Sequence, residues 1–186
     1  MVDTSAENAG SNVCLVVDHS GSMTGTNLEQ AQRAVSSFIQ TAGSKMKTGL
    51  VAFDDVAEML CPMTESTGMV QRAVDNLTAD GGTHIANGLV SNECLANQSG
   101  NRVIILLSDG EDSEESANQM DSVINPLKQG LSSMRWALIL RTLPTSAGSV
   151  RRPAEIPAFE SSEDLGSVTR PLKNFVSGLC NPFHGV

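Results

Sequence analysis

The sequence predicts a single α/β domain with a doubly wound, mostly parallel sheet, one antiparallel edge strand, and helices on both faces. Short apolar runs of strand length recur along the chain, and segments with the apolar period of amphipathic helices lie between them. Because strands and helices alternate, parallel neighbours are joined by right-handed helical crossovers. At 186 residues the chain is long enough for one domain, residues 1–186, with its own core.

Four apolar runs lack the strict alternation of a half-exposed strand, so they predict strands that are buried on both faces. They are residues 13–17, 49–53, 103–107 and 136–140. A fifth run, residues 56–60, follows Phe53 after only Asp54 and Asp55. This short connection predicts an antiparallel hairpin at the edge of the sheet.

Helical apolar periods fill the segments between these runs. They cover residues 28–42, 69–77, 85–90 and 120–131. Thr26 and Glu29 have the spacing of a capping box before the first helix, and Ser116 and Gln119 have the same spacing before the last.

The two ends of the chain are less regular. Residues 1–11 form a polar N-terminal extension, and residues 141–157 form an extended loop that contains several prolines. A short strand near residues 156–159 and a closing helix over residues 162–179 are expected to complete the domain.

Charge and composition exclude several classes of partner. The formal net charge is −9, and residues 1–134 have 17 acidic and 6 basic side chains. Such a body repels polyanions, so nucleic acid and anionic membrane surfaces are poor partners and a cation is favoured. No apolar run has the length of a membrane-spanning helix, and no signal peptide is visible. Membrane insertion is therefore not expected, and a cytoplasmic location is favoured.

The four cysteines are widely separated and include no Cys-x-x-Cys pair. We predict buried thiols rather than a disulfide framework or a zinc site.

Polar residues follow two of the predicted strands at the point where each strand ends. Asp18 comes directly after residues 13–17, and Asp109 follows residues 103–107 with only Ser108 between. Open α/β sheets bind ligands outside the carboxyl ends of their strands. Both carboxylates are therefore expected at the same rim.

Hydroxyl side chains are expected to join these carboxylates. Asp18, Ser20 and Ser22 occupy alternate positions, so an extended backbone would point all three the same way. Thr83 follows two glycines that allow its segment a close approach. Two carboxylates and three hydroxyls suit a hard cation, Mg²⁺ first and then Mn²⁺ or Ca²⁺.

The same five positions resemble the metal ion-dependent adhesion site (MIDAS) of von Willebrand factor type A domains. They are Asp18, Ser20 and Ser22 in Asp-x-Ser-x-Ser, Thr83 after Gly-Gly, and Asp109 in Ser-Asp-Gly. The resemblance implies the Rossmann-like fold of that family and a single divalent cation. The three hydroxyls would be ligands, and the two carboxylates would bind the cation directly or through water. An open coordination position would capture a Glu or Asp side chain of a partner protein.

We therefore predict a protein-binding module for adhesion that is not an enzyme. One alternative is a metal-dependent phosphotransfer enzyme or phosphatase, because an Asp after a first strand can be a nucleophile beside Mg²⁺. Enzymes of the haloacid dehalogenase type usually have a second Asp where this chain has Ser20. Another alternative is a scaffold or adaptor subunit of a larger assembly that contains an AAA ATPase. The P-loop, dinucleotide and serine-hydrolase motifs are absent from the sequence.

Nearby polar residues are expected to have structural roles. His19 should contact neighbouring backbone, and His84 should lie at the rim without binding the metal. The acidic run is expected to interact with the dipole of the following helix rather than to extend the metal site. Its members are Glu111, Asp112, Glu114 and Glu115.

Overall fold

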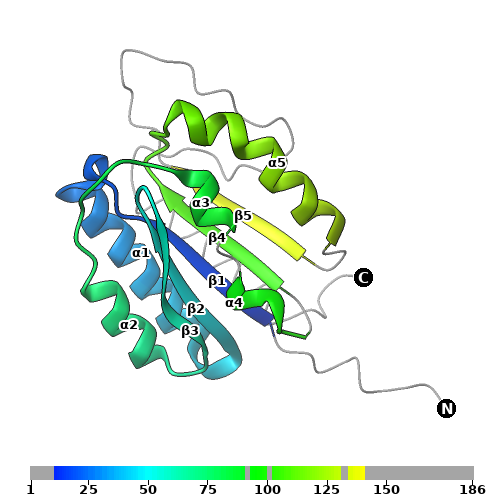
Figure 1. Ribbon diagram of the computed structural model, residues 1–186. Coiled ribbons are helices and arrows are strands. Elements are labelled where there is room, and N and C mark those ends of the chain that lie inside the picture. Colours follow the sequence, from blue (N-terminus) through cyan, green and yellow to red (C-terminus); the bar gives the residue numbers. More distant parts are fainter. Residues whose placement is uncertain (1–10, 91–92, 100–101, 131–133, 141–186) are drawn as a thin grey trace, which may run out of the picture.

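The computed structural model describes residues 11–90, 93–99, 102–130 and 134–140, and it confirms the predicted fold class. Five strands form one sheet in the order β3-β2-β1-β4-β5, with helices on both faces (Figure 1). The strands are β1 (Ser11–Asp18), β2 (Met46–Phe53), β3 (Ala57–Thr64), β4 (Arg102–Ser108) and β5 (Met134–Leu140). The neighbours β2-β1-β4-β5 pair in parallel, whereas β3 pairs antiparallel with β2, as the predicted hairpin requires.

The central strand β1 is buried on both faces, which explains why its sequence is apolar without alternation. Every residue of β1 is buried, because helices cover both faces of the sheet at this strand. Val13, Leu15 and Val17 pack in one core cluster, and Cys14 and Val16 pack in the other. Both faces of the strand therefore need apolar side chains.

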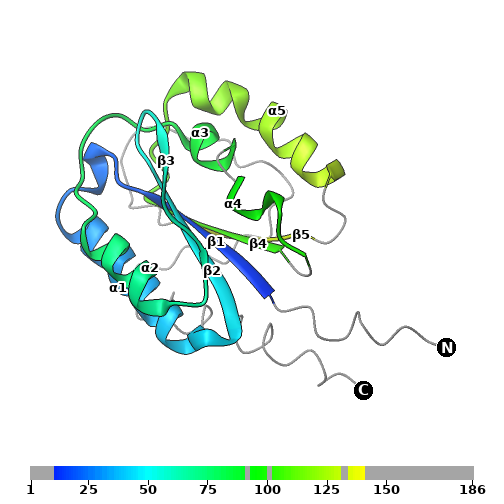
Figure 2. The same cartoon turned by 60° about the horizontal axis from the view of Figure 1, so that its bottom comes forward.

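The helices form one layer on each side of the sheet (Figure 2). On one face lie α1 (Thr26–Ala42) and α2 (Thr67–Asp75), and on the other lie α3 (Ile85–Val90), α4 (Glu93–Ala96) and α5 (Glu114–Gly130). Short 3-10 turns, η2 (Gly21–Met23) and η3 (Gly43–Lys45), flank α1. The four-residue helix α4 was not predicted. None of the described helices is both long and apolar enough to cross a membrane.

Both predicted capping boxes are wrong. The residue before α1 is Gly25, with φ of 76°, and no side chain caps that helix end. The positive φ of this glycine sets the entry angle of the chain, and its carbonyl accepts the N–H of Glu29. The helix α5 begins at Glu114, before Ser116, and the Ser116 N–H donates to the hydroxyl oxygen of Ser113 at 3.1 Å.

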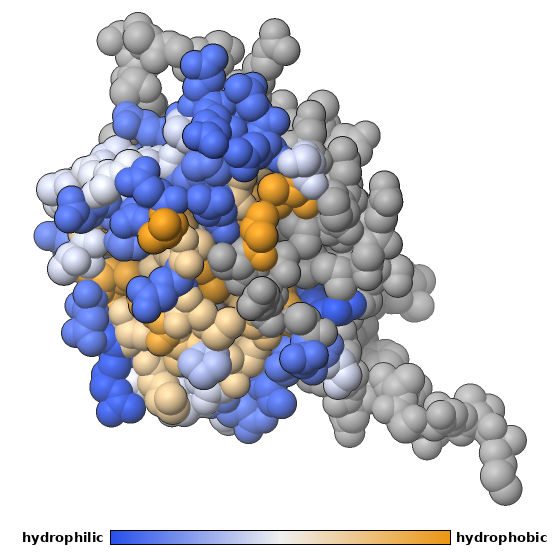
Figure 3. Space-filling model, viewed as in Figure 1, coloured by the Kyte–Doolittle hydropathy of each residue, from blue (hydrophilic) through white to orange (hydrophobic). Residues whose placement is uncertain are grey.

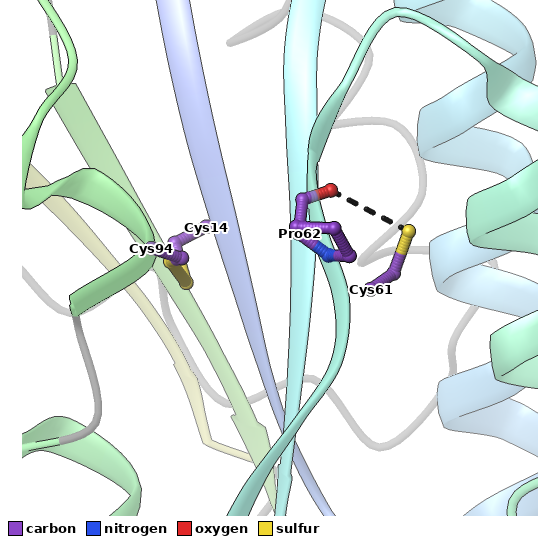
Figure 4. Close-up of a disulfide and its surroundings, with 4 residues drawn as sticks. All are labelled: Cys14, Cys61, Pro62 and Cys94. Atoms are coloured by element: carbon purple, nitrogen blue, oxygen red, sulfur yellow. Dashed lines mark hydrogen bonds between the residues drawn. A yellow bond between two sulfur atoms is a disulfide. The ribbon is translucent and has the colours of Figure 1, made fainter.

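The prediction of unpaired thiols is wrong for two of the cysteines. Cys14 of β1 and Cys94 of α4 form a disulfide, with their Cα atoms 6.8 Å apart (Figure 4). No local pattern predicts this pair, because the two residues lie 80 positions apart and meet only when α4 packs on β1. Cys61 is a free, buried thiol as predicted, and it belongs to the core cluster on the opposite face of the sheet.

Several predictions fall outside the described residues. They are the extension up to residue 10, the loop over residues 141–157, the strand near residues 156–159, the helix over residues 162–179, and the state of Cys180.

Candidate functional site

Asp18 lies at the carboxyl end of β1, and its side chain is fully buried. One carboxylate oxygen, Oδ1, accepts the backbone N–H of Ser20 at 2.9 Å. The other, Oδ2, accepts the hydroxyl of Ser108 at 2.6 Å. Since both oxygens are engaged, the orientation of the carboxylate is fixed by the chain around it.

The environment of Asp18 disfavours its negative charge. Burial raises the pKa of Asp18 above its ordinary value, and the nearby charge of Asp109 raises the pKa further. The hydrogen bonds from Ser108 and Ser20 act in the opposite direction but are outweighed. Within the described part of the chain no Lys, Arg or His forms an ion pair with either carboxylate. A bound cation would supply the countercharge that these side chains lack.

Ser20 and Ser22 bring two hydroxyls next to this carboxylate. Ser20 is fully buried with extended backbone, φ −60° and ψ 168°. Ser22 lies in η2, so the predicted extended stretch ends at Ser20 and a helical turn brings Ser22 back. The two hydroxyl oxygens lie 3.1 Å apart. Ser20 therefore contacts both Asp18 and the hydroxyl of Ser22, although by a different backbone path from the one expected.

Asp109 follows β4, and its side chain is 9% exposed. Its Oδ1 accepts the N–H of Glu111 at 3.1 Å, and its Oδ2 lies 3.5 Å from the amide nitrogen Nδ2 of Asn27. The same amide donates to the carbonyl of Ser22 at 3.1 Å. Asn27, in the first turn of α1, thus connects the Asp109 side of the site with the Ser22 side.

Backbone hydrogen bonds place the segment of Thr83 beside the loops that follow β1 and β4. The preceding glycine segment packs against the loop after β1, where the Gly21 N–H donates to the carbonyl of Gly81 at 3.0 Å. Gly81 has φ of 74°, which glycine tolerates without strain. The carbonyl of Thr83 accepts the N–H of Ser113 at 3.1 Å. Within the described residues, the Thr83 hydroxyl makes no hydrogen bond to the other four predicted ligands.

The donor atoms gathered here suit a hard cation. They are carboxylate and hydroxyl oxygens, which Mg²⁺, Mn²⁺ and Ca²⁺ prefer over the nitrogen and sulfur that zinc or copper favour. No group of three or more His, Cys, Asp or Glu side chains in the described ranges could hold a metal. The predicted site has only two such side chains, so its remaining protein ligands would be hydroxyls.

Two residues that the sequence did not single out help to build the site. The sequence pattern shows Ser108 only as the neighbour of Asp109 in Ser-Asp-Gly, and it assigns no role to Asn27. Their contacts span 90 and 82 positions of sequence, so only the pairing of the strands reveals them.

The two histidines near the site have other partners. The Nδ1 atom of His19 lies 3.0 Å from the carbonyl oxygen of Thr78, which confirms the predicted backbone contact. His84 is half-buried, and its Nδ1 accepts the N–H of Asn87 at 3.3 Å.

The acidic run after Asp109 divides into two parts. Glu114 and Glu115 are exposed in the first turn of α5, as the dipole interpretation predicts, and this turn forms part of a hydrophilic area in Figure 3. Asp112 is only half-exposed and instead accepts the N–H of Ile85, at the start of α3, at 3.1 Å.

The family model described as von Willebrand factor type A domain matches residues 13–111, from β1 to just beyond Asp109. The chain belongs to this family.

A relative of this type A domain matches most of the chain. An uncharacterized protein of Synechocystis sp., sll0103, is 32% identical over 137 residues, which cover 71% of this chain and 31% of that protein. The chain therefore spans about a third of that relative's length.

Solved structures share the fold. The domain of the type V pili tip protein Mfa5 from Porphyromonas gingivalis is 28% identical, with a TM-score of 0.53 over 56% of this chain and 39% of that chain. The PilB minor pilin from Streptococcus sanguinis has a TM-score of 0.75 at 13% identity, covering 95% of this chain and 63% of that chain.

Proposed function

We propose that this type A domain is a protein-binding module that depends on one divalent cation, with Mg²⁺ preferred. One observation supports it most strongly. The carboxylates of Asp18 and Asp109 are buried near each other at the carboxyl ends of adjacent strands, without a cationic side chain paired to either in the described part of the chain. Buried charges without such a partner are costly unless a cation neutralises them.

In this proposal five residues hold the cation as an intact MIDAS. Ser20, Ser22 and Thr83 supply hydroxyl oxygens, and Asp18 and Asp109 bind the cation directly or through water. When bound, the cation supplies a coordination position for a carboxylate from outside the chain. The partner is a protein that contributes a Glu or Asp side chain. The two carboxylates of this chain only balance the charge of a divalent cation, so the site has no excess negative charge that would repel a third carboxylate.

A binding role is favoured over phosphotransfer by the surroundings of Asp18. A nucleophilic carboxylate needs an oxygen that reaches the substrate, but Asp18 is fully buried and both of its oxygens accept hydrogen bonds. The description of Mfa5 as a pilus tip protein also suits a role in adhesion.

The metal step is tested by calorimetric titration of EDTA-treated protein with Mg²⁺, Mn²⁺ and Ca²⁺. We expect the wild type to bind one equivalent and Asp18→Ala to bind none. Glu58→Ala is the matched control, because Glu58 is an exposed acidic residue of β3. Equal binding by wild type and Asp18→Ala would reject the site.

The partner step is tested with peptides that differ in a single side chain. From a random peptide library we would select those that the metal-loaded wild type retains and EDTA releases. We expect each to lose binding when its Glu or Asp is changed to Gln or Asn. Peptides that bind equally well after that change, or in EDTA, would contradict carboxylate capture.

A further inference from the structure

Thr83 lies just before a helix whose first N–H groups have no acceptor within the helix itself. Two of these groups are bonded by side chains from another part of the chain. Ile85 N–H donates to Oδ1 of Asp112 at 3.1 Å, and Ala86 N–H donates to the hydroxyl oxygen of Ser116 at 2.9 Å. The acceptors lie 27 and 30 residues further along the sequence. We call these two hydrogen bonds the trans cap.

Further contacts support both acceptors of the trans cap, Asp112 and Ser116. Oδ1 of Asp112 also accepts the N–H of Ser113 at 3.0 Å, and the N–H of Ser113 donates to the carbonyl of Thr83 at 3.1 Å. Ser116 is fully buried, so its hydroxyl has no competing water. The backbone around Thr83 is thus bonded at three successive points to the segment that follows Asp109.

The helix dipole does not explain these contacts. Asp112 precedes α5, whose first turn already contains the exposed Glu114 and Glu115. A side chain that served only the α5 dipole would need no bond to the start of α3. The contact with Ile85 instead joins the two segments that contain Thr83 and Asp109.

We propose that Asp112 and Ser116 are positioning residues for the metal site, an inference that rests on the proposed function. They hold the Thr83 segment against the Asp109 segment before the cation binds. Without the trans cap, cation binding would have to order the Thr83 segment, and the entropy lost in doing so would weaken affinity. Residues that orient metal ligands in this way typically contribute about 10- to 100-fold in metal affinity.

The test compares substitutions that remove the cap acceptor with substitutions that remove only charge. We expect Asp112→Ala and Ser116→Ala each to weaken Mn²⁺ binding by about tenfold or more in calorimetry. Asp112→Asn keeps an acceptor oxygen and should stay within about twofold of wild type. Glu111→Gln and Glu114→Gln are matched controls, because each removes a neighbouring charge and no cap acceptor.

A second measurement needs no metal. In EDTA-treated protein the amides of Ile85 and Ala86 should exchange hydrogen slowly in wild type, and at least about tenfold faster in the two alanine variants. Amides of β1 serve as the reference for global opening. This readout separates a local loss of the cap from general destabilisation.

The outcomes distinguish the positioning role from the proposed function. If wild type binds Mn²⁺ and Asp112→Ala binds it equally well, the positioning role is wrong and the metal site stands. If Asp112→Asn loses as much affinity as Asp112→Ala, the effect comes from charge and the positioning role is again wrong. If wild type binds no divalent cation, the proposed function fails and the positioning role fails with it.

Discussion

Asp18 and Ser108 are joined by a 2.6 Å hydrogen bond from the serine hydroxyl to Oδ2 of the carboxylate, across 90 positions of sequence. They meet because β1 and β4 pair in parallel and each residue lies at the carboxyl end of its strand. The same hydroxyl accepts the N–H of Gly110 at 3.0 Å, so Ser108 contacts both Asp18 and the loop that begins with Asp109.

Ser108→Ala removes the donor to Asp18 and the acceptor for Gly110. Because the site is buried, we expect the free energy of unfolding to fall by about 1–3 kcal/mol. The pKa of Asp18 should rise further, since this hydrogen bond opposes the effect of burial. Urea denaturation would measure the change, with Ser44→Ala, an exposed serine in η3, as the control. A Ser108→Ala variant as stable as wild type would contradict the role of this bond.

The raised pKa of Asp18 predicts how the metal-free domain responds to pH. A carboxyl whose folded pKa is raised binds its proton more tightly in the folded state, so its contribution to stability is fully present below the unfolded value near 3.8. The contribution is lost as the pH rises through the raised folded value. The side chain of Asp18→Asn cannot titrate. As the pH rises from about 3.8 through the folded pKa, the free energy of unfolding of this variant should therefore increase relative to that of wild type. Denaturation midpoints of the two proteins over that pH range would show it, and parallel curves would contradict the shift.

The affinity for the metal should rise with pH, whereas the contribution of Asp18 to the stability of the metal-free domain falls with pH. The cation competes with the proton on Asp18, so affinity should fall as the pH is lowered through the raised pKa. Titrations of wild type at several pH values would measure this. An affinity that does not change through the window would argue that Asp18 is not a ligand.

Two helical glycines should respond to alanine in opposite directions. A Cβ at Gly88 of α3 would lie 2.6 Å from Cδ1 of the buried Phe53, whereas a Cβ at Gly68 of α2 meets nothing within 4 Å. The gain in helix propensity is at most about 1 kcal/mol, and overpacking costs about 1–3 kcal/mol. We expect Gly88→Ala to destabilise the domain and Gly68→Ala to stabilise it by a few tenths of a kcal/mol. Thermal denaturation measures both, and a stabilised Gly88→Ala would contradict the packing described.

The disulfide predicts sensitivity to reductant. It closes a loop of about 80 residues, for which the chain-entropy estimate is about 4–5 kcal/mol of stability. Reduction, or the pair of substitutions Cys14→Ala and Cys94→Ala, should lower the denaturation midpoint, while Cys61→Ala should leave the effect of reductant unchanged. Thiol counting on the unfolded protein gives the number of free thiols directly. A reactive thiol at Cys14 would contradict the pairing.

The same disulfide is relevant to the cellular compartment of the protein. Disulfides persist mainly in oxidising compartments, so its formation in cells would favour such a compartment over the cytoplasmic location that the sequence favoured.

Much of this fold could be predicted because its signals are local. Continuous apolarity in residues 13–17 and 103–107 predicts doubly buried strands, and their ends place Asp18 and Asp109 at one rim. The structure places both carboxylates at that rim, buried at the ends of adjacent strands.

What could not be predicted depends on contacts between distant segments. Cys14 meets Cys94 only because the short helix α4 packs on β1, and α4 is too short to show an apolar period. Asp112 looked like its acidic neighbours in sequence, yet in the structure it accepts the N–H of Ile85. In both cases the deciding partner is set by the packing of α3 and α4, which no local pattern encodes.

The metal site is tested most directly by a crystal structure of the protein grown with Mn²⁺, using anomalous scattering to locate the ion. We expect one strong peak among the oxygens of Asp18, Ser20, Ser22, Thr83 and Asp109. The peak should be absent in crystals of Asp18→Ala grown in the same way. A wild-type crystal without a peak there, or with Mn²⁺ bound only at other acidic residues, would contradict the site.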